Sequence, residues 1–374
     1  MKGWLALAFA CVAFAGCESP QVSQSVVPAQ SEVTPNLVSE PAATTTFPTE
    51  PAKPIPALVG IHLFAYSNET VDELAGQMPK FAAAGVNAVL IETSYSFDFK
   101  SHPEVGNPSA ITRDHARKLG VAAKQNGIRL IPELDCLGHQ SWKRSTHGLL
   151  KAHPEFEEPS PTTPDPTTDY LKSWCPQHPE VNRIAFDLID ELVEAFDTDA
   201  FHVGMDEVFN IASDKCPRCK GGDPAKLFSK AVNDLYGHIV SEKKWEIFMW
   251  GDRLLDPRKT GYSKWEAARN GTHGAIDLIP KDIVICDWHY ERRENYPSVP
   301  LFLAKGFRVW PAGFQPLEAT LRFSEFTQQQ RATNSAVLGY LCTTWSRGKP
   351  LTVLDWPPVS EVLKEWKTPA ASSP

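Results

Sequence analysis

The stretch AFHVGMDEVF, residues 200–209, is an apolar run that ends in two adjacent carboxylates, Asp206 and Glu207. Side chains alternate along a strand, so His202, Gly204 and Asp206 are expected to share one face. If that face lines a barrel, Asp206 lies near the barrel mouth, and Glu207 reaches over the mouth from another direction. One acid can then be held ionised by hydrogen bonds, while the other, near apolar groups, has a raised pKa and serves as a general acid. The competing interpretation is an acidic strand end that caps the next helix.

This run is one of eight short apolar runs, and segments of helical period separate them. All eight are continuously apolar rather than alternating, which is typical of parallel strands buried on both faces. The runs are LVGIHLF (58–64), VNAVLIE (86–92), IRLIPEL (128–134), AFHVGMD (200–206), EIFMWGD (246–252), DIVICDW (282–288), FRVWPAG (307–313) and AVLGYLCTTW (336–345). The pattern predicts an α/β fold with a single (β/α)8 TIM barrel over residues 57–368 and no second folded domain.

The segments between the runs carry helix signals. A helix at 70–85 is expected to begin with a Thr cap and to end at a glycine, and a second helix at 109–127 also ends at a glycine. Further helices are expected at 179–196, 223–244, 317–331 and 355–366.

Polar and aromatic side chains stand where several of the runs end. They are Glu92, Glu133, Asp135, Asp206, Glu207, Trp250, Asp252, Trp288 and Trp345. In a TIM barrel the carboxyl ends of the strands form the active-site face. A purely structural origin would scatter such residues over both ends of the strands, so their clustering predicts an enzyme.

The amino-terminal segment is expected to lie outside the fold. Residues 1–16 carry a Lys and then an apolar stretch, which is typical of a secretion signal peptide. FAGC resembles a bacterial lipobox and predicts a lipidated Cys17, with an ordinary cleaved signal as the alternative. Residues 17–56, rich in Pro, Ser and Thr, predict a disordered tether, and 369–374 a disordered tail. The protein is thus expected to be exported and anchored in the cell envelope, at the outer membrane rather than the inner, since Glu18 replaces the usual retention Asp.

The amino-acid composition limits the classes of binding partner. The net charge of −8 and the lack of a basic run argue against a nucleic-acid partner. The eleven Trp and nineteen Phe fit a packed core, but Trp also stacks on sugar rings.

Six cysteines lie beyond Cys17 in the predicted barrel. They are Cys136, Cys175, Cys216, Cys219, Cys286 and Cys342. An exported protein can oxidise them, but the sequence does not give a pairing. The CPRC motif at 216–219 fits a tight disulfide, half of a zinc knuckle or two free thiols. A four-Cys zinc site that adds Cys136 and Cys175 is a further alternative.

Several of these motifs together resemble one enzyme family. HVGMDE resembles the His-x-Gly-x-Asp-Glu motif of family 20 glycoside hydrolases, the β-N-acetylhexosaminidases. IRLIPELDCLGHQSW is similar to that family's third-strand segment, FMWGDRLL to its fifth-strand end and GYLCTTWSR to its eighth-strand end. GVNAVLIETSYSFDF and CPQHPE look most like the hexosaminidase D-like branch. The resemblance covers residues 58–347 and implies the same barrel fold.

The resemblance also implies a reaction. Family members remove terminal β-linked GlcNAc or GalNAc with retention, and they use no enzyme nucleophile, because the substrate's acetamido oxygen attacks the anomeric carbon and forms an oxazoline. By position, Glu207 is implied to be the general acid and later the base. Asp206 is implied to orient the acetamido N–H and to stabilise the developing positive charge. No cofactor and no catalytic metal are implied.

Substrate-binding residues follow from the same resemblance. Trp250, Trp288 and Trp345 match positions that box the acetamido methyl and the sugar ring, with barrel core as the alternative role. Tyr290 is the candidate for the hydrogen bond to the acetamido oxygen. Asp252, His139 and His202 are expected to bind or orient, with a structural role as the alternative for the histidines.

One departure from the family pattern concerns the first strand. Many members carry an Arg at its end that grips sugar hydroxyls, whereas GIHLFAY offers His62 and no Arg. Glu92 is expected to compensate. The segment 154–170 is expected to be a long loop at the mouth of the site, which shapes subsites or is disordered.

Two other functions compete with this one. A surface glycan-binding protein with a decayed site is favoured by the missing Arg and opposed by the otherwise complete set of residues. A metal-dependent barrel hydrolase would use His202, Asp206, Glu133, Asp135 and His139. Such barrels commonly carry H-x-H on the first strand, and none of the eleven histidines forms that motif.

Overall fold

The computed structural model describes residues 56–107, 110–143, 145–345 and 348–367. The predicted signal peptide, Cys17, the tail and nearly all of the tether lie outside these residues, so their roles stay predictions. Within the described part, no helix is both long and apolar enough to span a membrane.

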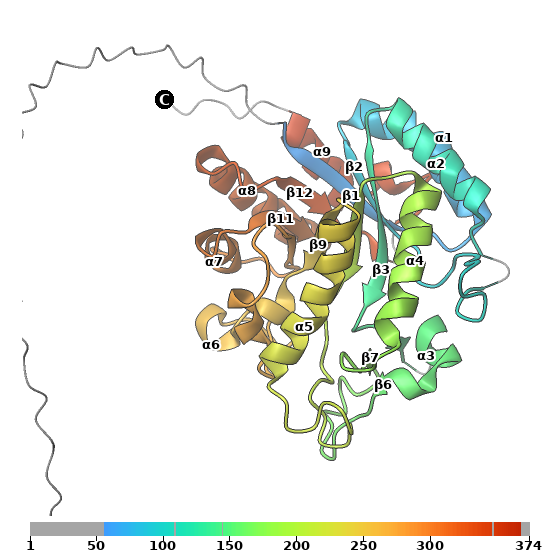
Figure 1. The fold of residues 1–374 in the computed structure, drawn as a ribbon. Coiled ribbons are helices and arrows are strands. Elements are labelled where there is room, and N and C mark those ends of the chain that lie inside the picture. The colour runs from blue at the N-terminus through green and yellow to red at the C-terminus, as the bar shows by residue number, and fades with distance from the viewer. Residues whose placement is uncertain (1–55, 108–109, 144, 346–347, 368–374) are drawn as a thin grey trace, which may run out of the picture. The chain divides into compact units, whose positions relative to one another are not determined.

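The eight predicted strands close into one parallel barrel (Figure 1). They are β1 (Leu58–Phe64), β2 (Ala88–Glu92), β3 (Arg129–Cys136), β8 (Ala200–Gly204), β9 (Glu246–Trp250), β10 (Val284–Trp288), β11 (Arg308–Gly313) and β12 (Gly339–Cys342). Consecutive barrel strands pair in parallel, and β1 closes the ring by pairing with β12 in the register Leu58 to Gly339. The predicted TIM barrel is confirmed, because each run is long and apolar enough to form a strand buried on both faces.

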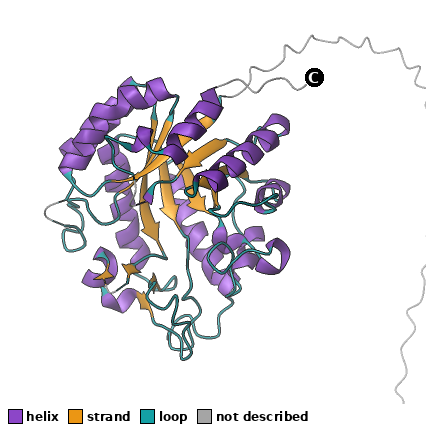
Figure 2. Cartoon of the chain, turned by 180° about the vertical axis from the view of Figure 1, so that it is seen from behind, coloured by secondary structure: helices purple, strands orange, loops and turns teal. Residues whose placement is uncertain are grey.

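Helices surround the strands (Figure 2). Six match the expected segments: α1 (Asn68–Ala84), α2 (Arg113–Gln125), α4 (Val181–Phe196), α5 (Pro224–Tyr236), α8 (Leu317–Thr333) and α9 (Pro357–Lys367). Three shorter ones are α3 (Gly148–Ala152), α6 (Pro257–Thr260) and α7 (Ser298–Ala304). The crossover from β9 to β10 holds α6 and two 3-10 turns, at Asp252–Leu254 and Thr272–Asp277, and α5 runs on into a π-helical turn at Gly237–Glu242.

The expected Thr cap of the first helix is wrong. Ser67 caps α1, and its side chain accepts from the N–H of Thr70 at 3.3 Å. A cap side chain satisfies an N–H two or three residues inside the helix, so Thr70 is the recipient and not the cap. The expected glycine end is confirmed, because Gly85 takes a left-handed φ of 93° there.

The barrel interior is filled by side chains. Trp310 and Trp250 are among its largest buried residues. Gly60 makes room for Trp310, since a Cβ at Gly60 would lie 2.3 Å from the indole. Large residues on some strands and glycine or alanine on their neighbours thus give a packed core below the carboxyl ends of the strands.

The strand that carries the paired acids ends earlier than expected. Ala200 and His202 face the interior, but β8 stops at Gly204, and Gly204, Met205 and Glu207 have positive φ values of 64°, 73° and 47°. The alternation predicted to carry Asp206 onto the inner face therefore stops before that residue. The left-handed turn, rather than the pleat, brings both acids to the mouth.

The crossover from β3 to α4 carries two small antiparallel sheets. One pairs β4 (Ser141–Trp142) with β5 (Ser145–Thr146), and the other pairs β6 (Glu157–Glu158) with β7 (Ser173–Trp174). The loop expected at 154–170 is part of this excursion. An ion pair of 2.7 Å between Asp165 and Lys264 links it to the segment between β9 and β10.

Candidate active site

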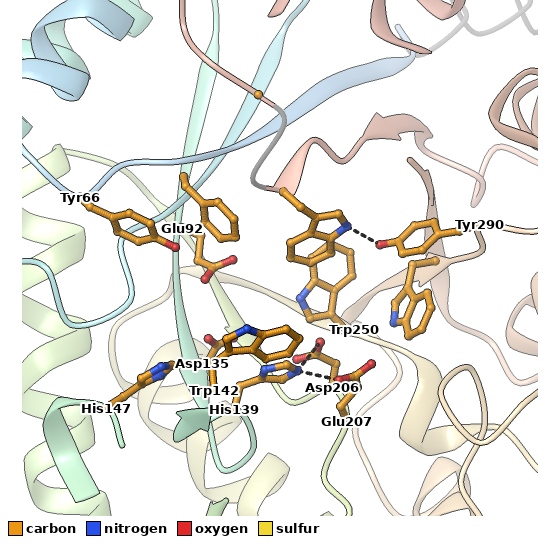
Figure 3. Close-up of a pocket in the computed structure, with 14 residues that line it drawn as sticks. Tyr66, Glu92, Asp135, His139, Trp142, His147, Asp206, Glu207, Trp250 and Tyr290 are labelled. Atoms are coloured by element: carbon orange, nitrogen blue, oxygen red, sulfur yellow. Dashed lines mark hydrogen bonds and ion pairs between the residues drawn. The ribbon is translucent and has the colours of Figure 1, made fainter. Parts of the chain in front are cut away.

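A cavity of about 750 Å³ opens at the carboxyl ends of the strands (Figure 3). Its volume is within the usual range for small-molecule sites. Its lining residues are Phe64, Tyr66, Glu92, Asp135, His139, Trp142, His147, Asp206, Glu207, Trp250, Trp288, Tyr290, Trp345 and Gly348. Eight of the ten predicted site residues are among them. The other two, Asp252 and His202, are buried and lie outside the lining.

The two adjacent acids converge on one histidine. Nε2 of His139 lies 3.3 Å from Oδ2 of Asp206 and 3.2 Å from Oε2 of Glu207 (Figure 3). Burial alone would lower the pKa of His139, but the charge of Asp206 and hydrogen bonding with both acids raise that pKa well above its usual value. Burial would likewise raise the pKa of Asp206, but the imidazolium lowers it. The histidine is therefore a cation, and Asp206 stays ionised.

A glycine lets the histidine approach the acids. Gly138 precedes His139, and a Cβ at Gly138 would lie 2.5 Å from the carbonyl oxygen of Asp206. A larger residue would push apart the loops that follow β3 and β8. Close packing thus explains why a glycine precedes the histidine in the third-strand segment. The glycine permits the contact that the histidine makes.

A buried polar network supports the floor of the cavity. Glu133 is fully buried, and its Oε1 accepts from Nε1 of Trp250 at 2.7 Å. The same oxygen lies 2.8 Å from Nδ1 of His202, whose ring packs against Trp250 at 4.6 Å. His202 therefore contacts the underside of the cavity wall and fixes Trp250. It has no surface in the cavity with which to touch a ligand.

Asp252 holds the backbone of the second acid. Its Oδ2 accepts from the N–H of Glu207 at 3.0 Å and from Nε of Arg253 at 2.6 Å. Its Oδ1 accepts from Nε1 of Trp288 at 3.4 Å. Burial raises the pKa of Asp252 to about 6, although Arg253 opposes the shift. This carboxylate thus positions an acid and an indole of the lining without lining the cavity itself.

The aromatic wall is joined to a tyrosine. Nε1 of Trp345 donates to the hydroxyl of Tyr290 at 2.9 Å, and the Trp288 ring lies 5.0 Å from the Tyr290 ring. Burial raises the pKa of Tyr290, so its phenol stays protonated. Because the oxygen already accepts from Trp345, its own proton is free to be donated into the cavity.

Two carboxyl groups form the opposite side. In Figure 3, Glu92 and Asp135 lie to one side of the paired acids and Tyr290 to the other. Burial raises the pKa of both groups well above the usual value, and the charge of Glu133 adds to the shift of Glu92 as the charge of Glu92 adds to that of Asp135. His62 stands 3.2 Å behind Glu92, and burial lowers its pKa to about 4, so the ring is neutral. The residue that replaces the expected arginine is therefore no cation and touches Glu92 rather than the cavity.

Sequence reasoning missed several lining residues. They are Phe64, Tyr66, Trp142, His147 and Gly348. Trp142 stands inside the third-strand segment, so that segment held a signal for it. Asp135 was placed at a strand end but not among the predicted sugar-binding residues, and it also lines the cavity. Trp142 is 47% exposed and stacks on His139 at 6.2 Å, which places a free aromatic face at the mouth.

The alternative metal centre finds little support among the described residues. The five residues that it requires do not form one compact group of ligands, whereas His62, Glu92 and Glu133 come within 4.8 Å of one another. The arrangement instead offers a cationic histidine, a fixed carboxylate, a second acid and a tyrosine donor around one aromatic cavity. That set suits acid–base chemistry on a ring-shaped polar ligand.

Comparison with known proteins agrees with this geometry. The model of the glycosyl hydrolase family 20 catalytic domain matches residues 88–348. A β-hexosaminidase of Vibrio furnissii is 24% identical over 285 residues, which are 70% of this chain and 42% of that protein. This chain thus spans less than half of that relative.

Solved structures show the same fold. A chitobiase of Flavobacterium johnsoniae superposes with a TM-score of 0.60 at 17% identity, over 82% of this chain and 47% of that one. A β-N-acetylhexosaminidase of Bacteroides fragilis gives 0.60 at 16% identity, over 84% and 68%. The family model covers all eight barrel strands except β1, and it includes the paired acids and most of the cavity lining. The chain therefore belongs to glycosyl hydrolase family 20.

Proposed function

We propose that this protein is an exo-acting, retaining β-N-acetylhexosaminidase that uses the acetamido group of its substrate as the nucleophile. The observation that carries the proposal is the convergence of Asp206 and Glu207 on His139 in a cavity walled by indoles. Two neighbouring carboxylates can serve two neighbouring atoms of one sugar. Glu207 faces the glycosidic oxygen, and Asp206 faces the acetamido N–H.

In the first step the acetamido oxygen attacks the anomeric carbon as the bond to the leaving oxygen breaks. Glu207 gives its proton to that oxygen, and Asp206 accepts a hydrogen bond from the acetamido N–H as nitrogen becomes positive. Tyr290 donates to the acetamido oxygen and aligns it for attack. Water then opens the oxazoline at the anomeric carbon, with Glu207 as the base, and the configuration is retained.

The hydroxyl groups of the sugar can form hydrogen bonds with the side of the cavity that Glu92 and Asp135 line. Glu92 and Asp135 are buried acids with raised pKa values, so they can both donate to and accept from hydroxyls. We propose that they take the place of the absent arginine, with His62 fixing Glu92 from behind. Either GlcNAc or GalNAc can form hydrogen bonds with Glu92 and Asp135.

The first test measures hydrolysis of 4-nitrophenyl β-N-acetylglucosaminide and its galacto epimer by residues 50–374. We expect turnover by the wild type and a loss of several orders of magnitude in Glu207→Gln and Asp206→Asn. A series of substrates with increasingly fluorinated acetamido groups should slow progressively, because fluorine makes the attacking oxygen less nucleophilic. A rate that is insensitive to fluorination would exclude the acetamido nucleophile.

The competing glycan-binding function makes a different prediction. A silent wild type that still binds a thiazoline mimic of the oxazoline would indicate an intact site with the wrong leaving group or sugar. A protein that neither turns over nor binds the thiazoline would favour the binding function. Membership of the hexosaminidase D-like branch and lipidation of Cys17 also stay proposals, and membrane fractionation of Cys17→Ser tests the second.

A further inference from the structure

A second group of buried polar side chains lies away from the cavity. It consists of Glu158, Cys175, Cys216 and Cys219, all of which are buried. Glu158 lies in β6, and Cys175 directly follows β7. The two remaining cysteines belong to the CPRC motif between β8 and α5. The group therefore joins the loop excursion after β3 to the loop that begins with the paired acids.

The spacing of the sulfur atoms suits a shared metal ion. Sγ of Cys175 lies 3.3 Å from Sγ of Cys219 and 3.6 Å from Sγ of Cys216. The three sulfurs and a carboxylate oxygen of Glu158 all lie within 4.8 Å of one another. A disulfide would need about 2.0 Å. Ligands about 2.3 Å from a tetrahedral zinc ion stand about 3.8 Å apart, which is close to the observed spacing.

Glu158 is an independent indication of a cation site. The carboxylate is 1% exposed, and its Oε1 accepts from the N–H of Ser213 at 2.7 Å. Its Oε2 is buried and has no partner with hydrogen-bond geometry among the described residues. A buried carboxylate oxygen without a partner is costly. A cation bound to Oε2 and the three sulfurs would remove that cost.

The CPRC turn directs a backbone donor at one of its own sulfur atoms. The N–H of Cys219 donates to Sγ of Cys216 over 3.4 Å, so the turn fixes that sulfur within the group. A disulfide between any two of the three cysteines would leave the third thiol unused and Glu158 unpaired. A metal ion uses all four groups.

We propose that Glu158, Cys175, Cys216 and Cys219 bind a structural zinc ion. Thiolates select zinc among the common divalent ions, and a closed set of four protein ligands is the mark of a structural site rather than a catalytic one. The expected four-Cys site is corrected in one position, because Cys136 lies in β3 and Glu158 takes its place.

The ion would fix the loop that carries the paired acids. The two loops lie side by side (Figure 1), and the N–H of Thr162 also donates to Asp214 across them at 2.9 Å. Zinc would add a strong link between the same loops, close to the point where the chain leaves the active site. The proposal does not depend on the sugar that the enzyme accepts.

The test measures zinc in protein purified under reducing conditions without chelator, by inductively coupled plasma mass spectrometry. We expect about one zinc ion per chain. Zinc should be lost in Cys216→Ala and reduced in Glu158→Gln, and it should be retained in Cys342→Ala, a buried cysteine elsewhere in the barrel. Replacement with Co²⁺ should give thiolate-to-cobalt charge-transfer absorption and the visible bands of a tetrahedral ion.

Measurements on the wild-type protein alone can contradict the proposal. The test therefore stays decisive even if a variant fails to fold. Metal-free wild type with all three thiols open to alkylation after denaturation would exclude a zinc site. In a second wild-type preparation made without reductant, a mass lower by two hydrogen atoms, mapped to a disulfide among Cys175, Cys216 and Cys219, would exclude it too. A chelator that lowers the melting temperature of the wild type but not of Cys216→Ala would support it.

Discussion

The backbone N–H of Glu207 donates to Oδ2 of Asp252 over 3.0 Å, so the segment that follows β9 holds the backbone of the proposed general acid. Glu207 has a left-handed φ of 47°, which a residue other than glycine keeps only when its surroundings enforce it. Arg253 in turn holds the same oxygen from the other side. The backbone position of Glu207 is therefore set by a residue that lies outside the cavity lining.

Removing this support should slow the reaction more than it weakens binding. We expect Asp252→Ala to lower kcat about 100-fold with little change in KM, because a shift of about 1 Å in a catalytic group costs about that factor. Asp256→Ala is the matched control, since Asp256 caps α6 in the same segment and lies outside the cavity lining. Equal kcat values in wild type and Asp252→Ala would refute the positioning role.

The histidine cation should set the acid side of the pH profile. His139 lowers the pKa of Asp206, so removing the cation must raise the pKa of that carboxyl. The acidic limb of kcat/KM, where Asp206 gains a proton, should therefore move to higher pH in His139→Gln. Initial rates on an aryl glycoside over a pH series measure the shift. A limb that stays in place would mean that His139 does not control Asp206.

Tyr290 should contribute to catalysis through its proton. We expect Tyr290→Phe to lose about two orders of magnitude in kcat/KM, which is typical when one preorganised donor to a reacting oxygen is removed. Tyr66→Phe, on the far side of the cavity, should change kcat/KM only a few-fold. If the two variants behave alike, the donor to the acetamido oxygen is another group.

Trp142 should bind the part of the substrate beyond the terminal sugar. Its face is exposed at the mouth beside His139, so it can stack on a second ring. Trp142→Ala should raise KM for a chitin oligomer about three- to tenfold, the factor expected for one aromatic contact. KM for an aryl N-acetylglucosaminide serves as the internal control and should change less. Parallel changes for both substrates would place Trp142 in the terminal subsite.

The acidic wall should make stability fall with rising pH. Glu92, Asp135 and His139 all have raised pKa values, so the folded state binds their protons more tightly than the unfolded state. Their contribution is complete below the unfolded pKa values and is lost as pH rises through the folded ones. The melting temperature should fall less steeply with pH in Glu92→Gln than in wild type. An equal or steeper fall would contradict the raised pKa of Glu92.

The barrel strands and the end at which the cavity opens can be predicted from the sequence because their signals are local. A continuous apolar run such as 86–92 predicts a buried strand. An acid at the end of that run indicates the end of the barrel at which the site lies. For that reason the sequence predicts Glu207, Asp206 and three tryptophans at a site, and all five line the cavity. Asp252 and His202 do not line it, because their burial depends on neighbours from other strands.

The sequence by itself thus determined a parallel barrel, the end of the barrel at which the cavity opens and the pair of acids at the end of the fourth strand run. Only the tertiary structure decided that Asp206 and Glu207 share His139, that His62 lies behind Glu92 and that Glu158 meets three cysteines. Periodicity is a property of neighbouring residues, whereas each of these contacts joins loops or strands that are distant in the chain. Their geometry is fixed by left-handed turns and close packing at Gly138, which no run of hydrophobic residues records.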